Sequence, residues 1–211
     1  MNWSYQTDCL STKLTRAAGM LAKIRYYVST ATLRSIYYGI FSSLLTYGCQ
    51  VWGQSSNKHI SRLQHIQNRA VRIINFANYR EPSNPLYYKS NILKFSDFVK
   101  LQNFHHVHNA LNDNLPVPFN NLFTITTDTQ NYYDTRGAAQ TTQPSQAAQY
   151  KMLLPKVRTQ MYGINSATYQ SAAAWNTIVS NFPDEKFHLQ SKYTCKREIT
   201  MYLIYRYNQQ Q

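Results

Sequence analysis

The strongest constraint on how this chain folds is a short corner, Leu44–Gly53, between two long segments that each have the apolar spacing of an amphipathic helix. In both segments apolar residues recur every three or four positions, which places them on one face of a helix. Gly48 and Gly53 allow the backbone to turn through a positive φ, and Trp52 supplies a large ring that can pack between the helices. Together with Tyr47, these residues predict the structural corner of a helical hairpin.

The same periodicity recurs along most of the chain and predicts a mainly α-helical fold. Ser29 or Thr30 is expected to cap the second helix, because a hydroxyl oxygen there can accept from the free N–H groups of the first turn. Residues 150–159 are expected to form a pair of short strands or an extended arm. The expected helices cover about residues 8–28, 31–47, 58–75, 96–111, 166–178 and 195–207.

Changes in composition divide the chain into four parts. A turn-rich stretch at residues 77–85 ends a first helical unit, residues 1–80, and residues 81–123 are expected to form a helical connector packed on it. Residues 124–149 are rich in Thr, Gln, Asn and Ala and have few aliphatic side chains to bury, so we expect a flexible linker. Residues 150–211 are expected to form a smaller, α-rich C-terminal unit that could include a short β-hairpin.

Positive charge is concentrated in the first of these parts. The chain has 22 Lys and Arg against 9 Asp and Glu, a formal net charge of +13, and residues 1–80 hold ten of the basic residues with one acid, Asp8. This imbalance predicts a polyanionic partner such as RNA or DNA. A charged helical face is often simply solvated, but here few acids are present to balance it. The residues expected to contact phosphates are Arg62, Arg69 and Arg72, with Lys58 and Lys23 as lesser candidates.

Cysteine and histidine give little sign of a covalent framework or a metal site. The cysteines are odd in number and far apart (Cys9, Cys49 and Cys195), which argues against a disulfide framework and favours a reducing, intracellular compartment. His105 and His108 lie three residues apart and could share a metal, but no Cys or carboxylate stands at a supporting spacing. We therefore expect ordinary packed or surface histidines and no metal.

Neither a membrane segment nor a catalytic motif is evident in the sequence. No apolar run has the length of a membrane span, and the first residues lack the layout of a signal peptide, so no membrane partner is expected. The nine acids are scattered, whereas a two-metal polymerase or nuclease needs several carboxylates converging on one site. A Gly-rich phosphate loop, a zincin spacing and a nucleophile elbow are also missing. The chain on its own is expected not to be an enzyme.

Several short runs follow one another in an order that is typical of one protein family. They span nearly the whole chain: Lys13-Leu14, Gly19-Met20-Leu21, Arg25-Tyr26-Tyr27-Val28, Leu33, Ile36-Tyr37-Tyr38, Ser42-Ser43-Leu44-Leu45-Thr46-Tyr47-Gly48, Val51-Trp52-Gly53, Leu63, Ile66-Gln67-Asn68-Arg69-Ala70-Val71-Arg72-Ile73-Ile74, Asn84-Pro85-Leu86, Ile92-Leu93, Leu115-Pro116, Arg158-Thr159, Tyr162-Gly163 and Ala174-Trp175-Asn176. In identity and order these runs closely resemble the C-terminal region of reverse transcriptases from non-LTR (LINE-type, Jockey-like) retrotransposons.

This resemblance implies a helical thumb-like domain in residues 1–80, followed by the C-terminal extension of the polyprotein. In the family the thumb grips the template–primer duplex, so the implied partners are RNA, DNA or an RNA–DNA hybrid and the remainder of the reverse transcriptase. The fingers and palm, with their metal-binding aspartates and Tyr-x-Asp-Asp motif, have no counterpart in this sequence. Polymerase activity and any divalent metal are therefore expected of the parent protein only, and no catalytic residue can be assigned.

Two other functions fit the same residues. The basic helices could dock an acidic partner in a protein–protein interaction module, and such a complex should survive moderate salt with a defined stoichiometry. Alternatively, the chain could be a non-functional remnant of a mobile element that folds poorly without its palm.

Overall fold

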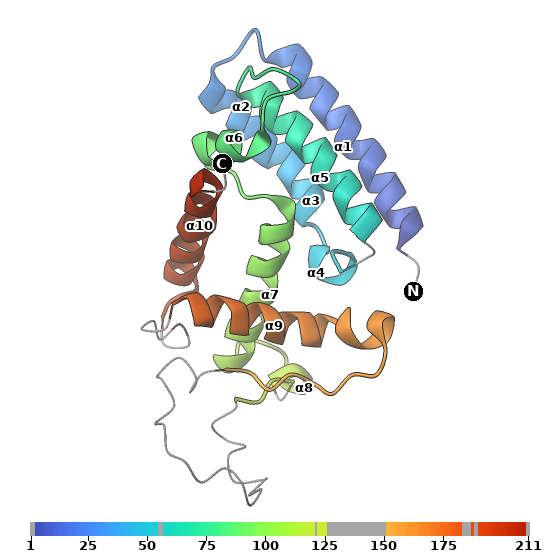
Figure 1. Cartoon of the computed structure of the whole chain (residues 1–211), viewed down its shortest axis with the longest axis vertical. Coiled ribbons are helices and arrows are strands. Elements are labelled where there is room, and N and C mark those ends of the chain that lie inside the picture. The colour runs from blue at the N-terminus through green and yellow to red at the C-terminus, as the bar shows by residue number, and fades with distance from the viewer. Residues whose placement is uncertain are drawn as a thin grey trace, which may run out of the picture. The chain divides into compact units, whose positions relative to one another are not determined.

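The computed structural model describes residues 3–54, 57–120, 122–125, 151–182, 187 and 190–209. It divides into two compact units, which are described separately: unit 1 comprises residues 1–99 and 200–211, and unit 2 comprises residues 100–199 (Figure 1). The described residues are mostly helical, which confirms the predicted fold class. In place of the expected pair of strands, the described residues contain one isolated antiparallel bridge, between Ile125 and Met152.

Unit 1 is a helical bundle formed mainly by the first half of the chain. Its second helix begins after Ser29, whose hydroxyl accepts from the backbone N–H of Thr32 as an N-cap. Two longer helices also contribute one end each, α7 (Phe95–Leu111) and α10 (Lys192–Gln209). The helices that lie wholly in this unit are α1 (Ser4–Ile24), α2 (Thr30–Ile36), the π-helix η1 (Tyr37–Ser42), α3 (Ser43–Thr46), α4 (Cys49–Trp52), α5 (Asn57–Ile74) and α6 (Ser83–Ser90).

Helices α1 and α5 lie side by side in unit 1 and run in the same direction (Figure 1). Near their N-terminal ends the Thr7 hydroxyl is 3.1 Å from Nδ1 of His59, and past their C-terminal ends the Arg25 guanidinium lies 5.2 Å from the ring centroid of Phe76. The apolar stripe of each helix is buried between them and their neighbours. Fully buried members of this core include Leu14, Ala18, Leu33, Phe41, Leu63, Ala70 and Ile74.

The segment predicted as one helix, residues 31–47, is interrupted by the π-helical turn η1. Within it the buried rings of Tyr37 and Phe41 stack with their centroids 5.1 Å apart and their planes 20° from parallel. A π-helical turn is wider than an α-turn, so residues four apart come closer to a common line along the axis. The buried ring contact contributes stability that works against the poorer backbone geometry of this turn.

A single buried amide joins three segments of unit 1. Nε2 of Gln67, on α5, donates to the Tyr37 hydroxyl and to the carbonyl oxygen of Leu93, both at 2.9 Å. Its Oε1 accepts from the backbone N–H of Phe95 at 2.8 Å and from Nε2 of Gln64 at 3.0 Å. The side chain is 2% exposed, so these bonds replace the water that burial removed. Gln67 therefore fixes α5 against η1 and the start of α7.

The corner between α3 and α5 is built around Trp52. Gly48 has a φ of 63°, the left-handed conformation that glycine adopts without steric cost, and it separates α3 from α4. The Trp52 ring is 3% exposed, stacks on Phe95 at a centroid distance of 5.3 Å, and donates from Nε1 to the carbonyl oxygen of Tyr47 at 2.9 Å. The Tyr47 side chain itself points to solvent.

Gly53 differs from the expectation of a positive φ. Its φ is −66°, which every residue type can adopt, so the turn itself does not require glycine here. A Cβ at this position would overlap the carbonyl oxygen of Cys49 and would lie 3.0 Å from Cγ2 of Val99. Close packing, rather than backbone conformation, is what a side chain at position 53 would disturb.

Unit 2 is centred on an aromatic cluster. Phe104, on α7, stacks on Trp175 with centroids 4.6 Å apart and meets the Phe187 ring edge-on at 5.5 Å. The other helices of this unit are α8 (Val117–Asn120), the π-helix η4 (Gln160–Ile164) and α9 (Ala167–Asn181), and Ser166 caps α9 by accepting from the N–H of Tyr169.

An extended segment passes α9 in unit 2. The Asn176 side chain accepts from the Met152 N–H at 2.7 Å and donates to the Met152 carbonyl at 2.9 Å. One amide side chain thus supplies the two bonds that a neighbouring strand would have made.

The predicted division into residues 1–80, 81–123, 124–149 and 150–211 stays a prediction. Unit 1 continues beyond residue 80 to residue 99 and takes in residues 200–211. Residues 126–150, which hold nearly all of the expected linker, lie outside the described residues. Thr124 precedes this gap, and its carbonyl oxygen accepts from the Leu153 N–H at 2.9 Å.

The histidines considered as metal ligands belong to the core of unit 2. His105 and His108 are buried, and Nε2 of His108 lies 3.0 Å from the carbonyl oxygen of Gln190. Within the described ranges, neither ring nitrogen of His105 has a hydrogen-bond partner. Burial, reinforced by the positive charge of Lys192, lowers the pKa of His105 to about 4. His105 is therefore held in its neutral form in the folded chain.

Replacing Trp52 tests whether the corner holds unit 1 together. We expect Trp52→Ala to lower the free energy of unfolding by about 3–5 kcal/mol, because it removes a buried ring and leaves a cavity beside Phe95. Urea unfolding followed by circular dichroism measures the change. Tyr47→Ala is the control, since an exposed side chain should contribute less than about 0.5 kcal/mol. A loss below about 1 kcal/mol for Trp52→Ala would contradict this role.

The lowered pKa of His105 predicts that mild acid destabilises unit 2. Its folded-state pKa of about 4 lies below the ordinary value of 6.5, so between these pH values the unfolded chain binds a proton that the folded chain does not. The stabilising effect is complete above pH 6.5 and is lost as the pH falls towards 4, with a size on the order of 2–3 kcal/mol.

The measurement compares the free energy of unfolding of the wild type and of His105→Leu between pH 7 and pH 4. Groups other than His105 titrate in both proteins and cancel in the difference, although the charges of His108, Lys192 and Lys196 set its exact size. His65→Leu, at an exposed position, is the control. Wild-type and His105→Leu curves that stay parallel over this range would show that His105 does not govern the acid response.

Candidate nucleic-acid interface

The basic residues of α5 recur along the side of the helix that faces away from the core. Lys58, Arg62, Arg69 and Arg72 are separated by four, seven and three positions, and residues at such spacings share one helical face. Lys58, Arg62 and Arg69 are exposed and Arg72 is half-buried. The structure thus brings these four side chains onto one face of one helix.

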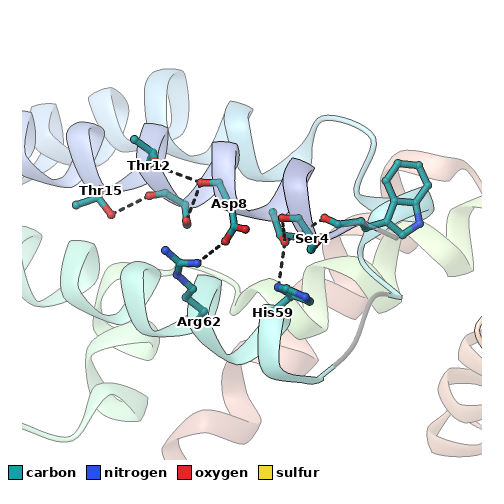
Figure 2. Close-up of polar contacts among 9 residues, drawn as sticks. Ser4, Asp8, Thr12, Thr15, His59 and Arg62 are labelled. Atoms are coloured by element: carbon teal, nitrogen blue, oxygen red, sulfur yellow. Dashed lines mark hydrogen bonds and ion pairs between the residues drawn. The ribbon is translucent and has the colours of Figure 1, made fainter. Parts of the chain in front are cut away.

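Arg62 is held by the acid of α1. Its Nη1 donates to Oδ1 of Asp8 in an ion pair between two side chains that are each more than half exposed (Figure 2). Exposed ion pairs of this kind contribute only about 0–1 kcal/mol, because water screens both charges. A phosphate could therefore replace the Asp8 carboxylate without a large loss of stability.

The hydroxyl groups of α1 near this pair bind their own helix. The side chains of Thr12 and Ser11 donate to the carbonyl oxygen of Asp8 at 3.1 and 2.9 Å, and Thr15 donates to that of Ser11 at 2.8 Å (Figure 2). The contacts that join α1 to α5 at this end are those of Thr7 with His59 and of Asp8 with Arg62. This end of the helix pair positions Arg62 and also carries the exposed Lys58.

Arg69 and Arg72 differ in how strongly they are held. Nε of Arg72 donates to the carbonyl oxygen of Glu81 at 3.0 Å. This bond does not use the two terminal nitrogens of the guanidinium. Arg69 makes no hydrogen bond or ion pair within the described part of the chain and is exposed. Arg69 is therefore the α5 arginine most ready to bind an anion.

Helix α1 adds cations to the surface of unit 1. Lys23, the residue named from the sequence, is exposed in the last turn of α1. Lys13 and Arg16 are exposed as well, and the sequence did not single them out. Their exposure could have been predicted from the sequence, because both positions lie off the apolar stripe of α1.

A group of residues at the C-terminal end of the α1–α5 pair was also missed. The Arg25 guanidinium lies 4.6 Å from the ring centroid of Tyr26 and 5.2 Å from that of Phe76, and the two rings meet edge-on at 6.2 Å. A contact over fifty residues of sequence separation cannot be read from helical periodicity. The adjacent Arg25-Tyr26-Tyr27 run was the available sign.

The described residues offer no metal site and no membrane helix. No group of three or more His, Cys, Asp or Glu among them could hold a metal ion. Among the helices of the described ranges, none is both long and apolar enough to cross a bilayer.

Comparison with known proteins gives one partial match among curated proteins. No family model matches the chain, and no solved structure matches it. A stretch of 54 residues is 39% identical to the probable RNA-directed DNA polymerase from transposon X-element of Drosophila melanogaster. The match covers 26% of this chain and 6% of that much longer protein. It supports a relationship between this chain and the reverse transcriptases of transposons.

Proposed function

We propose that this chain is the C-terminal part of a non-LTR (LINE-type, Jockey-like) retrotransposon reverse transcriptase, and that unit 1 grips template–primer nucleic acid. The observation that carries the proposal is the row of basic side chains along the outer face of α5, with Arg69 unpaired among the described residues. The partial match to a transposon polymerase supports the same assignment. Residues 1–80 then correspond to the thumb, and the other partner is the remainder of the polymerase.

The proposed mechanism is electrostatic and independent of base sequence. From Lys58 to Arg72 the row covers fourteen helical steps, about 21 Å along the helix axis. Double-stranded nucleic acid carries about one charge per 1.7 Å of its axis, so a row of this length can meet several phosphates. Contacts to phosphates position a duplex without reading its sequence, and an RNA–DNA hybrid is the natural occupant for a reverse transcriptase.

The ion pair between Arg62 and Asp8 acts as an internal competitor in this proposal. When a phosphate binds Arg62, the guanidinium turns from the Asp8 carboxylate to the phosphate oxygens, with which it can form two parallel hydrogen bonds. Asp8 then weakens binding by repulsion. Nucleotide addition and the metal ions that it needs belong, in this proposal, to the palm of the parent protein.

Loss of two arginines should change how salt affects binding. We expect Arg69→Ala combined with Arg72→Ala to weaken binding of an RNA–DNA hybrid and to reduce the slope of log K against log salt by about 2. Fluorescence anisotropy of a labelled blunt hybrid at several salt concentrations measures both quantities. The control, Arg34→Ala combined with Lys89→Ala, removes the same charge from α2 and α6 and should leave most of the slope intact.

Salt-independent binding, or none by the folded chain, would contradict the proposal. Equal effects of the two double variants would show that net charge alone, and not the α5 face, drives binding. If an acidic protein but no nucleic acid bound with a defined stoichiometry, unit 1 would instead be a protein-interaction module.

Asp8→Asn tests the internal competitor. Removing the carboxylate charge frees Arg62, so the affinity for the blunt hybrid should rise by about threefold or more at low salt, which corresponds to roughly 0.7 kcal/mol. Asp8 lies on the outer side of α1, and thermal unfolding should shift little. An unchanged or weaker affinity would show that Arg62 does not contact the nucleic acid.

A further inference from the structure

Helix α5 ends in a backbone arrangement that normally requires glycine. The N–H of Ala77 donates to the carbonyl oxygen of Arg72 at 3.0 Å, and the N–H of Phe76 donates to that of Ile73 at 3.3 Å. These are the two bonds of a Schellman motif, in which the residue after the C-cap adopts the left-handed conformation. That residue is Phe76, with a φ of 55°.

Two other helices end in the same motif but use residues suited to it. At the end of α6 the left-handed residue is Asn91, and at the end of α7 it is Asp113, each with a φ of 53°. Asparagine and aspartate tolerate this conformation, whereas a bulky aromatic residue there is a genuine outlier. Phe76 is the only such bulky residue with a positive φ in the described ranges.

Burial of the Phe76 ring does not offset this strain. The side chain is 49% exposed, and its neighbours are the Arg25 guanidinium and the edge of the Tyr26 ring, which is 71% exposed. Tyr27, which follows Tyr26, and Tyr79, three residues after Phe76, are 88% and 83% exposed. Backbone strain clusters at functional sites, so a half-exposed aromatic residue in the left-handed conformation motivates a search for a ligand.

The chemistry of this cluster suits an unpaired base. The planar cation of Arg25 contacts both aromatic rings, and both kinds of group stack on nucleobases whatever the base. Exposed Lys23 and Arg80 lie nearby in sequence, while the carboxylate of Glu81 is occupied by the N–H of Asn78 at 3.2 Å. In the sequence around the cluster three cations, Lys23, Arg25 and Arg80, stand against the one acid Glu81.

The position of the cluster favours a base over a phosphate. Arg25, Tyr26 and Phe76 lie past the C-terminal ends of two parallel helices, where the backbone dipoles leave partial negative charge. A neutral base is not repelled by this partial charge, and the cations of the last turns, Lys23 and Arg72, remain available to phosphates. The cationic row of α5 leads towards this point, so a duplex held along the row would deliver its end to the rings.

We propose that Arg25, Tyr26 and Phe76 form a stacking platform for an unpaired nucleotide of a single strand where it leaves the duplex held by unit 1. This assignment rests on the proposed function, because the platform lies at the end of the duplex-binding face. The ligand is a single-stranded extension of RNA or DNA. The three side chains contribute stacking, which is insensitive to salt, whereas the α5 row contributes the salt-dependent part of the affinity.

The test compares a blunt RNA–DNA hybrid with the same hybrid carrying a three-nucleotide extension, using the whole chain and fluorescence anisotropy. Extensions of RNA and of DNA, on either strand, are separate arms. We expect the wild type to bind at least one extended hybrid at least fivefold more tightly than the blunt one, by a factor that stays constant between low and moderate salt. A 2-aminopurine in that extension should lose fluorescence on binding, as stacking requires.

Phe76→Gly is the decisive variant. Glycine suits the left-handed position, so the thermal unfolding temperature should be unchanged or higher, which separates the result from misfolding. The advantage of the extended hybrid and the 2-aminopurine signal should both disappear, while affinity for the blunt hybrid stays within about twofold. Arg25→Lys keeps the charge but not the planar group and should behave in the same way. Tyr5→Ala, at an exposed residue of the first turn of α1, is the control and should change neither affinity.

Each outcome decides between the two proposals. Equal wild-type affinity for blunt and extended hybrids would overturn the stacking platform and leave duplex binding by α5 in place. An extension advantage that Phe76→Gly retains would also overturn it. If the chain binds an isolated single strand through the platform but no blunt duplex, the platform stands and the duplex-binding proposal fails. Binding of an acidic peptide at these rings, with no effect of an extension, would replace the nucleotide by a protein partner.

Discussion

The arrangement of unit 1 depends on the buried amide of Gln67. Its Nε2 donates to the Tyr37 hydroxyl and the Leu93 carbonyl, and its Oε1 accepts from the Phe95 N–H, so one side chain sets the rotation of α5 about its axis. A buried amide left without these partners would cost about 1–3 kcal/mol for each unsatisfied group. Positions two residues away on a helix point to nearly the opposite side. With Gln67 directed inward, Arg69 must be directed outward.

The outer face of the α1–α5 pair changes in character along its length. At the N-terminal end Asp8 and Arg62 form an exposed ion pair, so charge there is partly neutralised. In the middle Arg69 is unpaired among the described residues. Past the C-terminal ends the exposed groups are planar: the guanidinium of Arg25 and the ring of Phe76. A polyanion that is double-stranded along the helices and single-stranded at their ends would match this order, because its exposed chemistry changes from phosphates to bases.

Features set by local patterns could be predicted from the sequence, and features set by long-range contacts could not. Apolar periodicity located α1 and α5, because burial on one face leaves a direct trace in the sequence, and it placed the exposed cations of α5 correctly on one face. The ion pair of Arg62 with Asp8 and the contact of Arg25 with Phe76 join residues about fifty positions apart, which periodicity does not encode. The turn at Phe76 was missed because the usual signal there is glycine.

Two segments of unit 1 break local rules, and they differ in what offsets the strain. The π-helical turn at Tyr37–Ser42 is offset within the fold, since Tyr37 stacks on Phe41 and its hydroxyl binds Gln67 in the core. The left-handed Phe76 is offset less, because its ring contacts Arg25 and Tyr26 but is half exposed to solvent. A sequence that satisfies its fold elsewhere departs from local preference mainly where function requires it. Of the two departures, only the one at Phe76 faces solvent, as the proposed stacking platform requires.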